Sequence, residues 1–212
     1  MVSLSGRTYQ EELFSTVKEP NYYIQRGEIA TFYSRKEILV TGGLGFLEKL
    51  IMAKLLRCCP EITTIYLLIR AKKQQDPQTR FKEFFNDVIK ERELKDVENK
   101  IILIEGDTSQ LNLGMSEKDR ERIKDIDLIF HSAASVRFMD NIRFIINTNV
   151  RGTRDLLLLA QEMKSLKAFV YVSTAYSHCV YNKIEEKFYK PPIKTEDIIK
   201  WTEILNEDHL TL

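Results

Sequence analysis

A short apolar run that ends in a cluster of glycines constrains the fold of this chain more than any other feature. Ile38, Leu39 and Val40 form the run, and the segment 41–45 (TGGLG) follows it directly. Apolar residues then recur at helical spacing over 47–55. A continuous apolar run is typical of a buried parallel strand. Glycines between a strand and a helix let the backbone approach a pyrophosphate group at the helix N-terminus. The pattern therefore predicts a strand, a phosphate-binding turn and a helix.

The rest of the chain alternates between strand and helix patterns. We expect a helix over 76–92, a short helix opened by Ser116 and Asp119 at capping-box spacing, and a long helix over 142–163. Four further apolar runs have the length of strands, at 65–69, 101–104, 126–130 and 168–172. In the long helix, steps of three and four place one set of residues on a single face: Ile142, Ile145, Asn149, Gly152, Leu156, Leu159 and Met163.

This order of elements predicts an α/β fold, a Rossmann-like doubly wound parallel sheet with helices on both faces. Of the 212 residues, 43% are apolar, which is enough to bury a core. The 32 basic residues balance 31 acidic ones, so nothing indicates a nucleic-acid partner. No apolar run approaches the ~18–20 residues that span a bilayer, and no secretory signal is evident. The three cysteines predict no disulfide framework, and we expect no metal site.

Candidate site residues follow the carboxyl ends of the predicted strands, where ligands bind in such sheets. Arg70 follows the second strand, where an arginine accommodates the 2′-phosphate of NADPH and so favours NADPH over NADH. A solvated arginine is the alternative. Asp107, with Thr108 beside it, follows the third strand. We expect Asp107 to accept a hydrogen bond from an adenine amino group, unless it is simply an aspartate in a turn.

Small residues follow the fourth strand. Ala133, Ala134 and Ser135 let the backbone pass close to a nicotinamide ribose, whereas His131 before them is more typical of a structural than of a catalytic histidine. Asn149 lies on the apolar face of the long helix, where an unpaired amide costs ~1–3 kcal/mol. We therefore expect Asn149 to bind neighbouring backbone and brace the loops of the site. A partly wet helix edge is the alternative.

Two hydroxyl residues follow the fifth strand. A hydroxyl at this end of the sheet can hydrogen-bond a substrate carbonyl, which makes Thr174, with Ser173 beside it, the candidate catalytic residue. The alternative is a loop of turn-forming residues. The candidate cofactor-binding residues are Thr41, Gly42, Gly43, Gly45, Phe46, Leu47, Arg70, Asp107, Thr108, Ala133, Ala134, Ser135 and Asn149.

Glu48 stands where the glycine pattern has its third glycine. Counting by threes from Gly42 and Gly45 leads to position 48. A glycine there lets helix and strand pack closely beside the phosphates, whereas a glutamate brings bulk and negative charge. A carboxylate in the first helical turn favours the helix but takes the electropositive pole that the phosphates need. We therefore expect weak binding of NADPH.

Together these segments resemble the extended short-chain dehydrogenases/reductases, and more narrowly the alcohol-forming fatty acyl-CoA reductases of animals. The resemblance runs from about residue 29 to about residue 189. Its broader part rests on 41–47 (TGGLGFL), 65–70 (IYLLIR), 106–107 (GD), 112–114 (NLG), 131–138 (HSAASVRF) and 149–153 (NVRGT). Its narrower part rests on 172–177 (VSTAYS) followed by 184–189 (IEEKFY).

The resemblance implies that NADPH reduces a long-chain fatty acyl-CoA through an aldehyde to a fatty alcohol. In the family, a tyrosine activated by a lysine four residues later donates the proton. A serine or threonine orients the carbonyl, and here this role falls on Thr174 or Ser173. None of the nine tyrosines of this sequence has lysine four residues later. We therefore expect an amino-terminal part of such an enzyme, or a short form without its activity.

The resemblance also divides the chain and suggests where it acts. It implies a lead-in (1–35), a Rossmann-like NADPH-binding domain (36–190) and the truncated start of a substrate-binding region (191–212). It implies an intracellular location, on the cytosolic side or with the peroxisome or endoplasmic reticulum. An uncovered fifth strand predicts self-association or a protein partner.

Two alternatives stay open. A non-catalytic nucleotide-binding or interaction module is favoured by Glu48 and by the missing tyrosine–lysine pair. A reductase or epimerase of nucleotide sugars is disfavoured by the segment 184–189.

Overall fold

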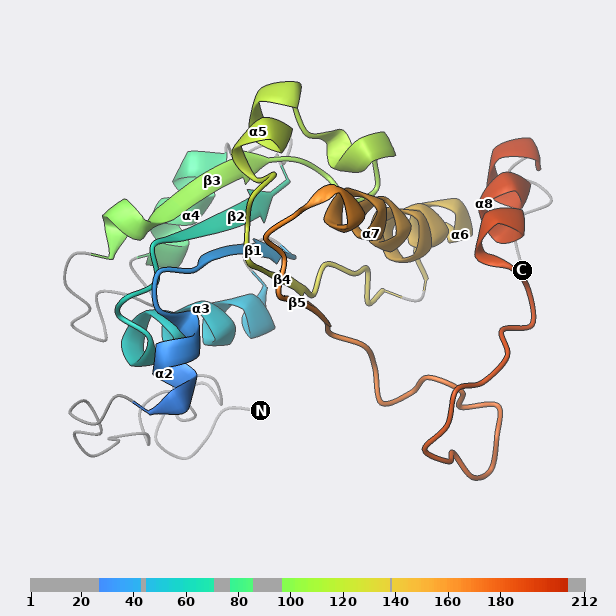
Figure 1. Ribbon diagram of the computed structural model, residues 1–212. Coiled ribbons are helices and arrows are strands. Elements are labelled where there is room, and N and C mark those ends of the chain that lie inside the picture. The colour runs from blue at the N-terminus through green and yellow to red at the C-terminus, as the bar shows by residue number, and fades with distance from the viewer. Residues whose placement is uncertain (1–26, 43–44, 71–76, 86–96, 138, 206–212) are drawn as a thin grey trace, which may run out of the picture.

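Five parallel strands form one sheet within the described residues, in the order β3-β2-β1-β4-β5 (Figure 1). The computed structural model describes residues 27–42, 45–70, 77–85, 97–137 and 139–205. The central strand β1 pairs with β2 on one side and with β4 on the other. The chain order therefore reverses at β1, which confirms the doubly wound, Rossmann-like sheet. The strands are β1 (Glu37–Thr41), β2 (Thr64–Ile69), β3 (Ile101–Glu105), β4 (Leu128–His131) and β5 (Ala168–Tyr171).

Helices cover both faces of this sheet. Successive residues of β1 point to opposite faces, so Ile38 and Val40 pack with α3 and Leu39 packs with α7. All three side chains are fully buried. The described helices are α2 (Glu28–Tyr33), α3 (Phe46–Cys58), α4 (Pro77–Phe85), α5 (Glu117–Arg122), α6 (Ile142–Ile146), α7 (Gly152–Glu162) and α8 (Thr195–Ile204). Shorter turns are η2 (Glu98–Lys100), η3 (Leu111–Gly114) and the π turn η4 (Asn147–Arg151).

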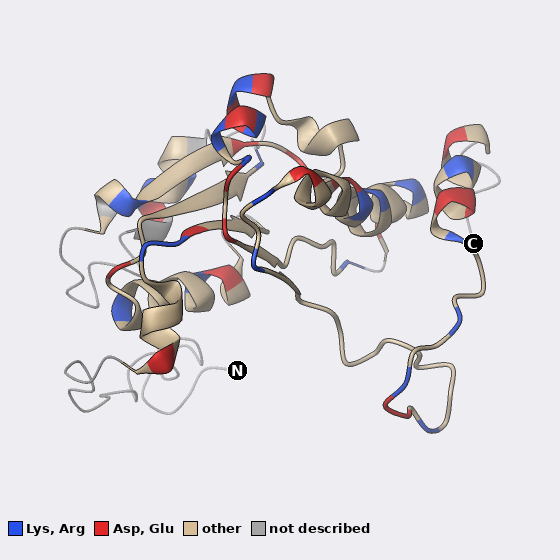
Figure 2. Cartoon of the chain, viewed as in Figure 1, with Lys and Arg blue, Asp and Glu red and all other residues tan. Residues whose placement is uncertain are grey.

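The strand and helix predictions agree closely with the fold. Each expected strand is present with ends shifted by two residues or fewer. The helix expected over 76–92 is α4, and residues 86–96 lie outside the described residues. Helix α5 begins as expected after Ser116, whose hydroxyl accepts a hydrogen bond from the Asp119 N–H at 3.1 Å. Figure 2 shows acidic and basic residues interleaved along α5 and along α8.

The long helix over 142–163 differs from its prediction because a π turn interrupts it. Elements α6, η4 and α7 follow one another without a break, and η4 accommodates one extra residue in its turn. The extra residue rotates the buried face. Ile146 and Thr148 are buried before α7, whereas Ile142 and Ile145 are only half-buried. The single apolar face predicted for the whole helix is therefore wrong for its first two turns.

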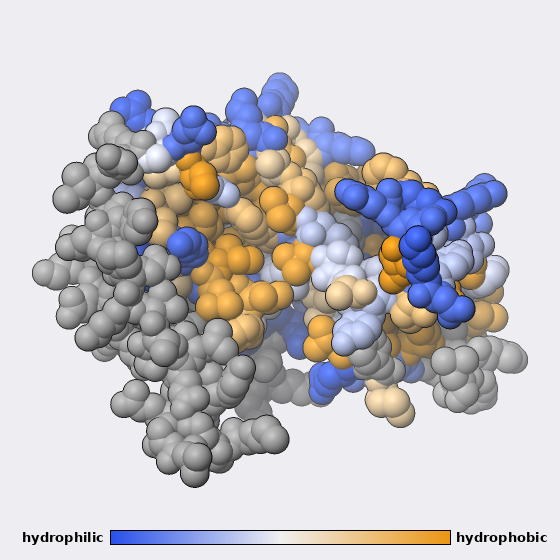
Figure 3. Space-filling model, turned by 90° about the horizontal axis from the view of Figure 1, so that it is seen from below, coloured by the Kyte–Doolittle hydropathy of each residue, from blue (hydrophilic) through white to orange (hydrophobic). Residues whose placement is uncertain are grey.

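Beyond β5 the chain leaves the sheet and returns as α8, which packs on α6 and η4 (Figure 1). Arg154 of α7 forms an ion pair with Glu196 of α8 at 2.8 Å. Val170 and Tyr171 of β5 are 42% and 48% exposed. Apolar side chains also gather on the face seen in Figure 3. Association with another chain through the β5 edge stays a prediction. The division into segments 1–35, 36–190 and 191–212 also stays a prediction.

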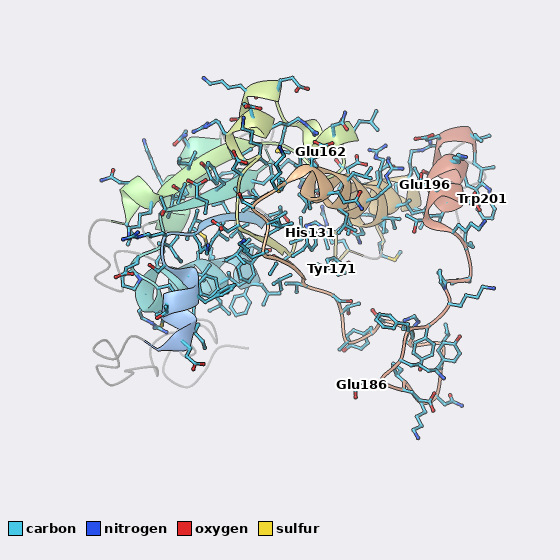
Figure 4. The ribbon with its side chains drawn as sticks, in the orientation of Figure 1. His131, Glu162, Tyr171, Glu186, Glu196 and Trp201 are labelled. Atoms are coloured by element: carbon cyan, nitrogen blue, oxygen red, sulfur yellow. The ribbon has the colours of Figure 1, made fainter. Side chains whose placement is uncertain are left out.

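His131 ties the centre of the sheet to the long helix. Its Nδ1 lies 2.6 Å from the Thr41 hydroxyl of β1, and its Nε2 lies 2.9 Å from the Thr153 hydroxyl of α7. The Thr153 hydroxyl donates to the Asn149 carbonyl at 2.7 Å. The protonated Nε2 therefore donates a hydrogen bond to the Thr153 hydroxyl. The unprotonated Nδ1 accepts one from the Thr41 hydroxyl. The ring is fully buried, beside Tyr171 in Figure 4, and burial lowers the pKa of His131 to about 4. His131 is a structural histidine, as its sequence context predicts.

Protonation of His131 should make the fold sensitive to acid. The pKa of His131 falls from an ordinary 6.5 to about 4 on folding, so the unfolded chain takes up a proton that the folded chain refuses. The free energy of unfolding should therefore fall by about 3 kcal/mol as the pH drops from 7 to 4. Urea unfolding at pH 7, 5.5 and 4 measures this loss. His131→Gln should flatten the dependence, whereas His178→Gln, at an exposed position, should keep it. An unchanged slope in His131→Gln would refute the assignment.

Candidate functional site

A pocket of about 230 Å³ opens at the carboxyl ends of the strands. Residues of the segments that follow β1, β2, β3 and β4 form most of its wall, and β2, α4, α6 and η4 supply the remainder. Parallel strands bring these turns to one edge of the sheet, which is where ligands bind in doubly wound folds. The lining residues are Gly42, Leu68, Arg70, Arg80, Gly106, Asp107, Thr108, Ala133, Ala134, Ser135, Val136, Arg137, Phe144 and Thr148.

The glycine turn after β1 is closed over by a side chain of its own helix. Gly42 has a φ of +124°, a conformation that side chains other than that of glycine rarely adopt. Gly45 is the N-cap of α3. A Cβ built on Gly42 lies 2.8 Å from the carboxyl carbon of Glu48, and one built on Gly45 lies 3.2 Å from the same atom. The Glu48 carboxylate therefore fills the space above both glycines.

Glu48 is buried although it carries a carboxylate. The residue is 5% exposed, and the Ser132 hydroxyl donates a hydrogen bond to its Oε1. Among the described residues no ion pair includes Glu48. Burial raises the pKa of Glu48, while the Ser132 hydroxyl and the backbone of α3 act in the opposite direction. Position 48 faces the phosphate turn, as the sequence predicts, and the glutamate takes up the room of the missing glycine.

Arginines line the opposite part of the pocket. The Nη1 of Arg80 donates to the backbone carbonyl of Arg70, which places the Arg80 guanidinium beside the end of β2. Burial, and then the charge of Arg70, lower the pKa of Arg80. Arg70 Nε lies 3.9 Å from Asp107 Oδ2, and Arg137 forms an exposed pair with Asp140 at 3.5 Å. A concentration of positive charge of this kind suits a phosphate dianion.

The loop after β3 is held rigidly against the helix. Asp107 Oδ1 accepts hydrogen bonds from the backbone N–H and the hydroxyl of Ser109, at 2.8 and 2.7 Å. Asp107 N–H donates to the Leu113 carbonyl at 2.7 Å. A Cβ on Gly152 of α7 would lie 3.0 Å from the Cβ of Thr108, so only glycine permits this approach. Gly152 therefore lets α7 pack closely against the loop after β3, and this contact fixes Thr108 at the pocket.

Asn149 braces the loop after β4. Its Oδ1 accepts from the Ser135 N–H at 2.8 Å, and its Nδ2 donates to the Ser135 carbonyl at 3.0 Å. These bonds confirm that the amide binds neighbouring backbone, against the alternative of a wet helix edge. Asn149 does not line the pocket itself. It positions Ser135, and any direct contact of Asn149 with a cofactor stays a prediction.

Thr148 lies in the pocket wall and has a buried hydroxyl without a hydrogen-bond partner among the described residues. The residue is 6% exposed and lines the pocket from the π turn. Its Oγ1 is buried and finds no hydrogen-bond partner among the described residues. A buried hydroxyl without a partner is costly, and π turns are frequent at functional sites. Thr148 is therefore a hydroxyl in the pocket wall whose hydrogen-bonding capacity is unused among the described residues.

The structure brings together only part of the expected site. Thr41 is buried and bonded to His131, and Phe46 and Leu47 are exposed on α3 outside the pocket lining. Gly43 lies outside the described residues. Seven of the expected cofactor residues line the pocket: Gly42, Arg70, Asp107, Thr108, Ala133, Ala134 and Ser135.

The two candidate catalytic residues lie apart from this group. Ser173 and Thr174 are exposed and do not line the pocket. Thr174 Oγ1 accepts from the Tyr176 N–H at 3.2 Å, in a local turn. Their proposed part in catalysis therefore gains no support from the geometry.

Sequence reasoning did not single out Arg80, Arg137 or Thr148. The one available signal for Arg80 is a basic residue at the start of the helix after β2, close along the chain to Arg70. Arg137 directly follows the small residues after β4. Thr148 is hidden by the regular helical pattern, because only the π turn brings it to the pocket.

The fold and the pocket define a nicotinamide-dinucleotide-binding domain of the short-chain dehydrogenase/reductase type. The terminal R domain of the myxalamid PKS-NRPS pathway is a similar solved structure, with a TM-score of 0.54 and 31% identity over 66% of this chain and 35% of that one. The PhqB reductase domain from Penicillium fellutanum shares the fold at a TM-score of 0.55 and 24% identity, over 84% of this chain and 44% of that one. This chain belongs to the NAD-binding family described as Male sterility protein, whose family model matches residues 40–211.

Curated relatives carry the name fatty acyl-CoA reductase. Fatty acyl-CoA reductase 1 of Homo sapiens is 43% identical over 180 residues, which are 82% of this chain and 35% of the relative. Fatty acyl-CoA reductase wat of Drosophila melanogaster is 40% identical over 204 residues, which are 94% of this chain and 38% of the relative. The chain thus spans little more than a third of the length of these relatives. Within the described residues, no helix has the length and apolarity needed to span a bilayer.

The hydroxyl of Thr148 should contribute nothing to the stability of the ligand-free chain. Thr148→Val removes a buried hydroxyl that has no partner, so the free energy of unfolding should stay constant or rise by up to ~1 kcal/mol. Thr202→Val is the matched control, because the buried Thr202 hydroxyl donates to the Ile199 carbonyl at 2.7 Å. That variant should lose about 1 kcal/mol. Urea unfolding compares the two, and an equal loss in both would show that Thr148 has a partner in the free protein.

Proposed function

We propose that this chain forms the NADPH-binding part of a reductase that acts on long-chain fatty acyl-CoA and yields a fatty alcohol. The family supplies the nicotinamide dinucleotide, and the names of the curated relatives supply the substrate class. The observation that carries the choice of NADPH is the pair of arginines, Arg70 and Arg80, at the pocket wall. A 2′-phosphate is the group that distinguishes NADPH from NADH, and arginine is its usual partner.

The adenosine half of the pocket fits this cofactor. Arg70 and Arg80 would bind the 2′-phosphate, and Asp107 and the hydroxyl of Thr148 would bind the adenine or its ribose. The buried Thr148 hydroxyl, which lacks a partner among the described residues, supports this arrangement independently of the arginines. NADPH supplies a hydride when it is bound. The residues of this chain bind and orient it, since Asn149 holds Ser135 and Gly152 admits the Thr108 loop.

A non-catalytic nucleotide-binding module is the second candidate. Two observations favour it for the chain as given. Thr174 is exposed and bonded within its own loop, and no tyrosine of the sequence has lysine four residues later. We therefore assign no proton donor to this chain. An organelle location, at the peroxisome or endoplasmic reticulum, remains part of the proposal and has no counterpart in the pocket.

Removal of Arg80 should reduce the preference for the phosphorylated cofactor. A charge-assisted hydrogen bond contributes ~1.5–3 kcal/mol, so Arg80→Ala should weaken NADPH binding at least about tenfold and leave NADH within about twofold. Isothermal titration of both cofactors with the full chain gives the ratio. Arg122→Ala on α5, outside the pocket lining, should change neither value. Equal losses for NADPH and NADH would contradict a 2′-phosphate site.

The chain as given should not turn over its proposed substrate at a useful rate. A positioned acid contributes ~10²–10⁴-fold to such reactions, and this sequence lacks the tyrosine–lysine pair. Incubation of the purified chain with NADPH and palmitoyl-CoA, followed by chromatography for fatty alcohol, measures the activity. Alcohol formation at the rate of a full-length relative would identify another residue as the acid and exclude the non-catalytic module.

A further inference from the structure

The candidate site consists of the open pocket and of an adjoining space at the glycine turn that a side chain of the protein fills. One part, between Arg80 and Thr148, is open. The other is the diphosphate seat, by which we mean the space directly above Gly42 and Gly45. In the fold of this chain, that space lies at the N-terminus of α3, where a dinucleotide places its pyrophosphate. Here the Glu48 carboxyl group fills it, 2.8 and 3.2 Å from the Cβ positions of the two glycines.

We infer that Glu48 is a built-in occupant of the diphosphate seat, so that the chain binds 2′-phosphoadenosine well and gains little from the rest of NADPH. This inference rests on the proposed function, because it takes the arginine side of the pocket as the adenosine site. The carboxylate resembles a phosphate in the two respects that matter at this position. It is anionic, and it places its oxygens at the positive end of a helix.

The surroundings of Glu48 hold its side chain in one conformation. Only 5% of the surface of Glu48 is exposed. The hydroxyl of Ser132, in the loop after β4, donates a hydrogen bond to its carboxylate. The backbone N–H of Ser132 donates to the Thr41 carbonyl at 3.2 Å, so β1, α3 and the loop after β4 meet at this point. A pyrophosphate that enters the seat must displace the carboxylate from these contacts and also meet a like charge. Both effects act on a dinucleotide, whereas neither acts on a ligand that lacks the diphosphate.

Adenosine 2′-monophosphate is therefore the probe that separates the two parts of the site. Isothermal titration of the parent chain should give similar affinities for adenosine 2′-monophosphate and NADPH. In Glu48→Ala, NADPH should bind at least tenfold more tightly than to the parent, whereas adenosine 2′-monophosphate should change by less than twofold. Glu48→Gly, which restores the glycine pattern, should behave in the same way and serves as a second variant if one of them folds poorly. Circular dichroism establishes that each variant is folded.

Glu117→Ala is the matched control. Glu117 is likewise an acidic residue in the first turn of a helix, but it is exposed on α5 and lies outside this pocket. Its removal should leave both affinities unchanged. If adenosine 2′-monophosphate binds and NADPH binds the parent and both Glu48 variants equally, the inference is overturned while the proposed function stands. If neither ligand binds the parent or the variants, the proposed function and the inference both fail.

Discussion

The hydrogen bonds of the neutral His131 ring hold together the elements on which the pocket depends. One nitrogen binds Thr41 at the end of β1, and the other binds Thr153 at the start of α7. The glycine turn begins directly after Thr41, and the loop from Ser132 to Arg137 begins directly after His131. The ring thus fixes the starting points of two walls relative to the helix that carries Asn149 and Gly152. Burial keeps the pKa of His131 low, so the ring stays neutral and can accept from Thr41 while it donates to Thr153.

Much of the fold follows from local sequence, because buried parallel strands must be continuous apolar runs and short loops leave few connections. The runs at 38–40 and 65–69 therefore predict β1 and β2 almost to the residue. Residues that follow strands are also predictable as a group, which is why Arg70 and Asp107 were found. Arg80 and Thr148 were not, since each reaches the pocket from a helix and its position depends on tertiary packing. The π turn in particular leaves no periodic signal, because it breaks the period itself.

The loops after β3 and β4 have the structure expected of a cofactor site, whereas the glycine turn departs from it at one position. The loops after β3 and β4 are braced by specific bonds, from Ser109 to Asp107 and from Asn149 to Ser135. Such hydrogen bonds restrict which residues these positions accept, and they hold the pocket in its shape before a ligand binds. The glycine turn has kept Gly42 and its positive φ, which a turn requires, but carries Glu48 where close access to phosphate would favour glycine. Backbone geometry and ligand access at this turn are therefore separable properties of the sequence.

The π turn η4 has a consequence for how a chain of this kind can vary in length. A helix that accommodates one extra residue can lose it without a break, because α6 and α7 are already continuous. With 3.6 residues per turn, a one-residue deletion rotates everything before it by about 100° relative to α7. Such a deletion would leave the sheet and α7 intact and turn Phe144 and Thr148 away from their present wall of the pocket. A single codon at this place thus sets the lining of the ligand site and the position of the buried Ile146, while the residues that α7 packs on the sheet stay the same.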